Sequence, residues 1–151
     1  MAKGTTQPRT KAPKFKVTPE QYNAFIKQVD LNWVYLESCS TKRHRLPNLE
    51  ASISYDEKVG RRSYEHTDDG FRALFNYQIK LVEAEQETPF AEIKCIYAAE
   101  YSSEIPMDDN IFSVFRELNL PLNVWPYVRE FVHGTTSRMG LPALVLRSLK
   151  R

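Results

Sequence analysis

The segment from Asn123 to Leu146 constrains the fold more than any other part of the chain, because it combines several strong local signals. Apolar residues recur along it at the spacing of one helix face. Pro126 lies in the first turns, where a missing backbone N–H costs least, and Gly140 followed by Pro142 is a typical helix end. The segment therefore predicts a long helix over about residues 122–139, which turns sharply into an extended apolar run.

Two further segments have the apolar spacing of short helices. Residues 18–29 open with Thr-Pro-Glu-Gln, which supplies a capping side chain at Thr18, a proline at the first helical position and the glutamine of a capping box. Residues 111–118 follow acidic and amide residues that suit a helix N-terminus. Pro121 is expected to separate this helix from the long one. Inside the long helix, Gly134 predicts the close approach of another backbone, with a contact between subunits as one candidate.

Four segments alternate apolar and polar residues with the period of two that is typical of strands. They are residues 31–36, 49–55, 71–82 and 90–101. The first of them has apolar residues on both faces, which predicts burial between two layers. The basic segment 41–48 is expected to be an exposed connection, and Asp-Asp-Gly at 68–70 a turn. These patterns predict an α+β fold, in which helices cover one face of a four-stranded antiparallel sheet.

The net charge of +2 is distributed unevenly along the chain. Residues 1–16 contain five basic side chains and no acidic one, and this composition predicts a disordered tail. Residues 17–151 carry 16 basic and 19 acidic side chains and are long enough to form a single domain. A basic tail can contact nucleic acid, but this tail has almost no aromatic residues, so a solubilising role is favoured.

No residue pattern in the sequence has the chemistry of a catalytic or metal site. His44, His66 and His133 are too far apart in sequence to form a metal-binding pair, and Cys39 and Cys95 lack a metal or redox spacing. We therefore expect free thiols, no catalytic residue and no cofactor, and the chain contains no phosphate-binding glycine loop. No apolar run approaches the ~20 residues that cross a bilayer, so a cytoplasmic protein is expected.

The sequence is rich in aromatic residues. Eight Tyr, eight Phe and two Trp make up 12% of the chain, and many of them lie in the predicted strands. A sheet that is covered on one face has only one core, so aromatic side chains on its other face must be exposed, meet another subunit or bind a ligand. The sequence therefore predicts an oligomer with apolar grooves.

The start and the end of the predicted long helix resemble the C-terminal signature of the SecB family of protein-export chaperones. The signature residues are Trp125, Pro126, Tyr127, Arg129, Gly140 and Pro142. Residues 87–90, Glu-Thr-Pro-Phe, are also similar to the start of the fourth strand of that family, and the resemblance covers about residues 30–146. It implies a SecB-like fold, a homotetramer, and an ATP-independent holdase that binds unfolded polypeptides in hydrophobic grooves.

The resemblance also implies which residues would bind unfolded clients. These candidates are Trp33, Tyr35, Phe75, Tyr77, Tyr97, Tyr101, Phe112 and Phe115. The expected partners are unfolded polypeptides together with either the SecA motor ATPase, for protein export, or an antitoxin. Family members contact SecA through a C-terminal extension, and the sequence shows none after Arg151, which weakens the expectation of SecA.

Two alternatives to a general export chaperone remain open at this stage. Some SecB-like proteins with an added N-terminal helix are dedicated chaperones of an antitoxin, and the helix predicted over 18–29 favours that role. The alternative from another class is a small oligomeric ligand-binding or enzyme domain. Such a domain requires a closed cavity with convergent polar groups, whereas a holdase requires open apolar grooves.

Overall fold

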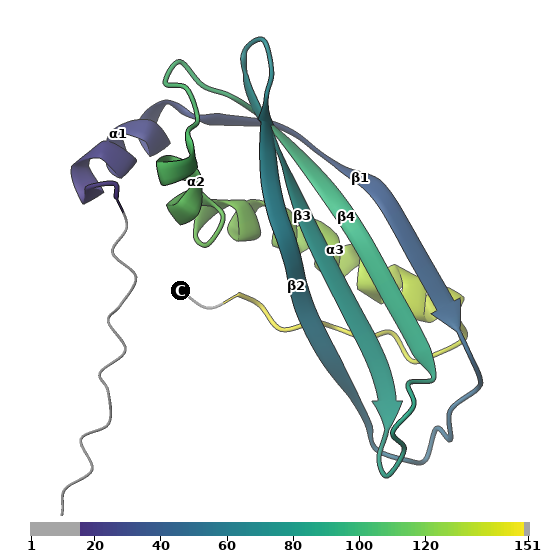
Figure 1. Cartoon of the computed structure of the whole chain (residues 1–151). Coiled ribbons are helices and arrows are strands. Elements are labelled where there is room, and N and C mark those ends of the chain that lie inside the picture. The colour runs from purple at the N-terminus through teal and green to yellow at the C-terminus, as the bar shows by residue number, and fades with distance from the viewer. Residues whose placement is uncertain (1–15, 150–151) are drawn as a thin grey trace, which may run out of the picture.

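Residues 16–149 are described by the computed structural model, and in this range four strands and three helices form two layers (Figure 1). The elements follow in the order α1 (Pro19–Gln28), β1 (Asp30–Arg43), β2 (Ile53–His66), β3 (Gly70–Glu83), β4 (Ala91–Ser102), α2 (Asp109–Phe115) and α3 (Asn119–Arg138). The strand order is β1-β4-β3-β2 and every neighbouring pair is antiparallel. The predicted α+β fold is confirmed. The disordered tail predicted over 1–16 lies outside the described residues, except for Lys16.

The central strands β3 and β4 build the core because their large apolar residues face the same side at every second position. Core-facing residues pair across the two strands: Phe71 with Tyr101, Phe75 with Tyr97, Tyr77 with Cys95, and Ile79 with Ile93. The helix α3 covers this face with Val124, Val128 and Val132, which are all fully buried. Each such aliphatic side chain contributes about 1.5–3 kcal/mol through its burial.

The helices α1 and α2 cover one end of the same face. The Thr18 hydroxyl accepts the Gln21 amide at 3.2 Å and the Gln21 side chain accepts the Thr18 amide at 3.0 Å, so the predicted capping box is confirmed. Phe25 of α1 is fully buried, with its ring centroid 6.1 Å from that of Phe71 and 6.0 Å from that of Phe115 in α2. The N-terminal helix is therefore part of the core.

α3 ends at the glycine-containing turn that the sequence predicted. The Leu141 amide donates to the Thr136 carbonyl at 3.1 Å, and the Gly140 amide donates to the Ser137 carbonyl at 3.1 Å. These two bonds form a Schellman motif, which requires a left-handed residue, and Gly140 has a φ of 75°. An added side chain at this position would have no neighbour within 4 Å, so lack of space does not explain the glycine. Glycine is needed because its backbone adopts the left-handed conformation without strain.

Both edge strands differ from the prediction. β1 continues to Arg43, so residues 41–43 belong to the strand rather than to the exposed connection. β2 begins at Ile53 and continues through a polar stretch to His66, whereas Leu49 lies in a turn before it. The predicted bounds of 31–36 and 49–55 were wrong because an edge strand buries little, and its backbone pairing decides its length.

The prediction that β1 is buried between two layers is also wrong. Only Val34 is buried in this strand, and Trp33 is 62% exposed. An irregularity between Leu31 and Trp33 sends these two side chains to opposite faces, since Leu31 pairs with core-facing Tyr101 and Trp33 with Glu100. β1 lies at the edge of a sheet that α3 covers on one face, and within residues 16–149 its other face meets no second layer.

The long helix differs from the prediction at its start. α3 begins at Asn119, so Pro121 lies in its first turn and does not separate two helices, and Pro126 lies inside the helix. At Gly134, the atoms nearest to an added Cβ belong to the side chains of Arg138 and Glu130, not to a backbone. Close backbone approach at Gly134 is therefore absent within the described chain, and the contact between subunits stays a prediction. No helix within residues 16–149 has both the length and the apolar character that a membrane span needs.

Candidate functional site

The chain after α3 runs back along that helix as an extended segment, residues 142–149, which we call the C-terminal segment (Figure 1). The Trp125 indole Nε1 donates to the Arg147 carbonyl at 2.8 Å, and the Arg129 Nε donates to the Leu146 carbonyl at 2.9 Å. The Leu146 side chain is only 1% exposed. Two signature residues thus bind consecutive carbonyls of an extended chain whose Leu146 side chain is buried.

An open cleft of about 510 Å³ lies between β2, α3 and the C-terminal segment, and we call it the C-terminal cleft. Its apolar lining comes from Val59, Phe75, Pro121, Trp125 and Leu149. Its polar lining comes from Glu57, Arg62, Glu117, Arg147 and Ser148. An apolar lining with charged groups around it, open to solvent, can accept an extended apolar peptide whose polar backbone stays partly hydrated.

Side chains packed against the lining of the C-terminal cleft hold that lining in place. The rings of Tyr77 and Trp125 meet edge to face, with centroids 5.4 Å apart. The Tyr77 hydroxyl donates to Glu57 Oε2 at 2.7 Å, and burial together with this bond raises the pKa of that hydroxyl. Arg62 pairs with Glu117 at 2.9 Å beside them. The contact with buried Tyr77 therefore holds the Trp125 ring of the cleft lining in one arrangement.

A second aromatic site lies on the uncovered face of the sheet, where Trp33 and Tyr35 of β1 form what we call the β1 aromatic pair. Their ring centroids are 4.8 Å apart. Arg72 donates through Nε to the Tyr35 hydroxyl at 2.8 Å and forms ion pairs with Glu37 at 2.5 Å and Glu65 at 3.2 Å. The hydrogen bond with Tyr35 and the contact with Glu37 raise the pKa of Arg72. A charged network thus orients one aromatic ring beside an exposed tryptophan.

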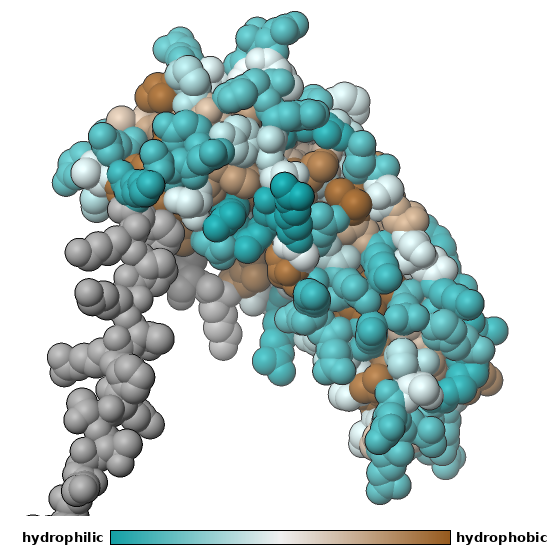
Figure 2. All heavy atoms as spheres, in the orientation of Figure 1, coloured by the Kyte–Doolittle hydropathy of each residue, from teal (hydrophilic) through white to brown (hydrophobic). Residues whose placement is uncertain are grey.

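The face of the molecule drawn in Figure 2 is mainly hydrophilic. In the view of Figure 2, hydrophobic side chains form small separate patches among hydrophilic ones. A further cleft of about 460 Å³ lies near α2, where the rings of Tyr64 and Phe112 are 4.6 Å apart and Arg61, Arg62 and Arg116 contribute to its lining. This cleft is more polar than the C-terminal cleft, so it is less suited to apolar chain segments.

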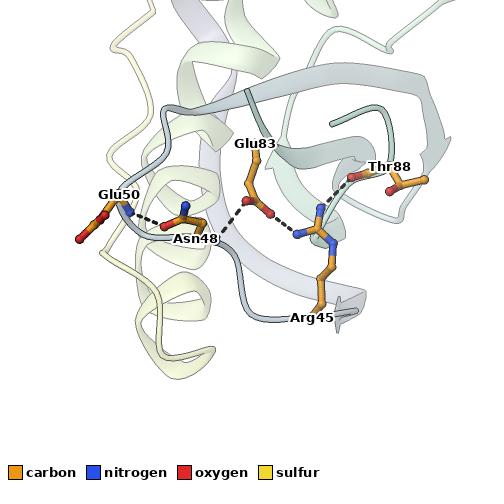
Figure 3. A network of polar contacts seen from close by, with 5 residues as sticks. All are labelled: Arg45, Asn48, Glu50, Glu83 and Thr88. Atoms are coloured by element: carbon orange, nitrogen blue, oxygen red, sulfur yellow. Dashed lines mark hydrogen bonds and ion pairs between the residues drawn. The ribbon is translucent and has the colours of Figure 1, made fainter. Parts of the chain in front are cut away.

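A polar network at the other end of the sheet anchors the connection between β1 and β2 (Figure 3). Arg45 donates to Glu83 and, at 3.3 Å, to the Thr88 carbonyl, while the Asn48 amide donates to Glu83 at 3.1 Å. The Glu50 amide donates to Asn48 Oδ1 at 3.0 Å. The bond from Arg45 holds the pKa of the Glu83 carboxyl below its usual range. This network ties the connection to the β3–β4 hairpin and shares no residue with the two aromatic sites.

The structure separates the eight client-binding candidates into three groups. Trp33 and Tyr35 form the β1 aromatic pair, and Phe75 and Phe112 line the two clefts although they are almost fully buried. The remaining four, which fill the core of the chain, are Tyr77, Tyr97, Tyr101 and Phe115. The strand period places the three tyrosines on the face that helices cover, and Phe115 belongs to one of those helices, α2. We carry the client-binding prediction forward on Phe75, which lines the C-terminal cleft.

Sequence reasoning missed several residues of the C-terminal cleft. Val59 and Glu57 lie in the part of β2 that was not predicted as a strand, where a shift of register follows Val59. Glu57 shares a face with Tyr55 and Val59, so the apolar–polar alternation is broken there and no local strand signal indicated these residues. The signature residues Trp125 and Arg129 were predicted as structural, and both bind the C-terminal segment.

The geometry defines a class of protein whose four-stranded antiparallel sheet carries helices on one face and open apolar clefts. Neither the family models nor the curated proteins give a match to the sequence. Among solved structures, the chain is similar to a SecB-like chaperone of Mycobacterium tuberculosis in complex with a ChAD peptide from the HigA1 antitoxin. The TM-score is 0.77 at 18% sequence identity, over 86% of this chain and 97% of that chain. The protein therefore has a SecB-like fold, which confirms the predicted resemblance at the level of structure.

Proposed function

We propose that this protein is a holdase chaperone that binds extended apolar segments of unfolded polypeptides in the C-terminal cleft, without nucleotide. One observation carries the proposal: the chain already binds an extended apolar segment of its own beside that cleft. Trp125 and Arg129 hold this segment through its carbonyls, which every residue type possesses. Recognition of backbone atoms together with an apolar lining tolerates many sequences, as binding of unfolded clients requires.

The uncovered face supports an oligomeric form of this chaperone. We propose that the β1 aromatic pair contacts another copy of the chain in a homotetramer, because Trp33 is 62% exposed on an edge strand. Residues 17–151 act as a single domain in this proposal, since their buried hydrophobic residues form one cluster. The native mass in solution tests the tetramer directly.

A dedicated antitoxin chaperone is the second candidate. The structurally similar mycobacterial protein was solved with an antitoxin peptide, and α1 of this chain is built into the core through Phe25. An export role with SecA as the partner is the remaining alternative. A toxin–antitoxin gene pair beside the gene, and tighter binding of that antitoxin than of other unfolded chains, would favour the dedicated role. The open clefts of the described chain favour both chaperone roles over a small-molecule enzyme.

The test measures aggregation of a denatured model protein by light scattering, together with binding of a labelled unfolded apolar peptide by fluorescence anisotropy. Val59→Glu places a charge in the C-terminal cleft, at a residue that is 43% exposed and can change without loss of the core. We expect about a tenfold weaker peptide affinity, since an unpaired charge in an apolar contact costs at least about 1.4 kcal/mol.

The matched control is Ser54→Glu, which adds the same charge to an exposed position of the same strand outside the cleft lining. It should retain the affinity and the suppression of aggregation. Equal affinities of the two variants would remove the C-terminal cleft as the client site. Absence of suppression by the unchanged protein would remove the holdase function itself.

A further inference from the structure

The two cysteines of the chain, which are far apart in sequence, lie opposite each other in the sheet. Cys39 of β1 pairs with Cys95 of β4 in the antiparallel register. The neighbouring core-side pair is Thr41 with Ile93, so both thiols project from the same face of the sheet. Directly opposed residues on one face are the closest side-chain neighbours that two strands can have.

The hydrogen-bond pattern shows which kind of antiparallel pair the cysteines form. The His44 amide donates to the Phe90 carbonyl at 2.8 Å, which makes residues 44 and 90 a hydrogen-bonded pair. The register continues without a shift from there to Cys39 and Cys95, and pair types alternate along it. Cys39 and Cys95 are therefore a non-hydrogen-bonded pair, the type with the closer side chains.

This pair type matches the geometry of a disulfide. Opposed residues in a non-hydrogen-bonded pair have Cα atoms about 4.5 Å apart. A disulfide needs a Cα separation of about 4.4–6.8 Å, a range that includes the spacing typical of this pair type. Both cysteines are free thiols in this structure.

The two thiols differ in access to solvent. Cys39 is exposed on the edge strand, whereas Cys95 is only 2% exposed. Burial, with a smaller contribution from the adjacent Cys39, raises the pKa of the Cys95 thiol to about 12. An oxidant in solution therefore reaches Cys39 first, and Cys95 reacts afterwards with the sulfur beside it.

We propose that Cys39 and Cys95 are a modification site at which a small disulfide, such as oxidised glutathione, cross-links β1 to β4. The Cys39 thiolate attacks the oxidant, whose S–S bond breaks, and one glutathione thiolate leaves. Cys95 then loses its proton, attacks the Cys39 sulfur of the mixed disulfide, and displaces the second glutathione thiolate. Two protein thiols are oxidised to one disulfide, and one oxidised glutathione is reduced to two glutathione thiols.

This disulfide would covalently link the edge strand β1 to β4. β1 is paired on one side only, and it carries the β1 aromatic pair. A disulfide at Cys39 prevents β1 from separating from β4, so the oxidised chain should melt several degrees higher than the reduced chain. Addition of dithiothreitol should reverse this shift.

The test incubates the full chain with oxidised glutathione and maps the products by mass spectrometry without reduction. We expect a peptide that joins Cys39 to Cys95 within one chain, with the loss of two hydrogen atoms. Cys95→Ala should instead accumulate glutathione on Cys39, because no second thiol displaces it. Cys39→Ser should remain unmodified at the buried Cys95.

Two results would overturn the proposal. One is a stable glutathione adduct on Cys39 of the unchanged protein, and the other is a disulfide that joins Cys39 of two chains. The unchanged protein supplies the decisive measurement, so the proposal stays testable even where Cys95→Ala lowers the stability. The holdase proposal does not depend on this result, since neither cysteine lines the C-terminal cleft.

Discussion

The covered face of the sheet buries its aromatic side chains under helices, whereas the uncovered face leaves Trp33 exposed beside Tyr35. On the covered face, apolar packing positions the rings, and open clefts lie at its edge beside α2 and beside the C-terminal segment. On the uncovered face, Arg72 and its carboxylate partners orient Tyr35. Aromatic side chains thus lie in the core, in a cleft and on an exposed surface, and the presence or absence of a covering helix decides which.

The largest expected effect is a difference in stability between alanine substitutions of the two tryptophans. Trp125→Ala removes a ring that is 7% exposed, its contact with Tyr77 and its bond to the C-terminal segment. We expect the free energy of unfolding to fall by about 3–5 kcal/mol. Trp33→Ala, the same change on the uncovered face, should cost about 1 kcal/mol or less.

Urea unfolding of both variants measures this difference, and limited proteolysis detects release of residues 142–149 in Trp125→Ala. Similar losses for Trp33→Ala and Trp125→Ala would contradict the distinction between the two faces. A lower native mass of Trp33→Ala, with unchanged stability of the single chain, would sharpen it by locating a subunit contact.

Alkaline pH should destabilise the covered face through Tyr101. Burial raises the pKa of this hydroxyl from 10.0 to about 12, against the smaller opposite effect of the bond from Asn123. Between these two values the unfolded chain loses a proton that the folded chain keeps, so stability is complete below pH 10 and falls as the pH rises towards 12. The full loss from this group is about 2–3 kcal/mol.

Urea midpoints measured from pH 9 to pH 12 test the effect of Tyr101. Tyr101→Phe lacks the titrating hydroxyl, so its stability should fall less over the same range, although it starts lower because the Asn123 bond is lost. Parallel pH profiles of the two proteins would show that Tyr101 is not the group responsible.

The turn that directs the C-terminal segment towards the cleft should depend on one glycine. Gly140→Ala forces a side chain into left-handed backbone, which costs about 1–2 kcal/mol. Gly134→Ala lies in regular helix next to flexible side chains, and it should be neutral or stabilising by up to about 1 kcal/mol. Thermal unfolding compares the two, and a stable Gly140→Ala would refute the role of the turn. A Gly134→Ala chain that is stable but has a lower native mass would support a subunit contact at α3.

The smallest effect should come from the charged network on the uncovered face. Arg72→Met removes the ion pairs with Glu37 and Glu65, whose carboxylates are partly exposed, so about 0.5–1 kcal/mol of stability should be lost. High salt should reduce the difference, because it screens these pairs in the unchanged protein. A difference that does not respond to salt would indicate that the contacts of the guanidinium with the Tyr35 ring and hydroxyl dominate.

Several local features could be predicted from the sequence because their causes lie within a few residues. The capping box at Thr18 and the glycine exit at Gly140 depend on neighbouring backbone groups. The strands β3 and β4 were predicted to within about a residue, since a buried face imposes alternation on them. The edge strands and the start of α3 were misplaced, because pairing partners and packing, rather than alternation, set their limits.

By itself, the sequence determined the α+β class, the order of the elements, the covered face of the central strands and the sharp exit from the long helix. Only the tertiary structure decided that β1 and β2 are edges, that Trp33 and Leu31 take opposite faces, and that Cys39 meets Cys95. It also decided that the C-terminal segment lies along α3 beside an open cleft. The physical reason is that register and burial depend on contacts between distant segments, and no local rule specifies which segments meet.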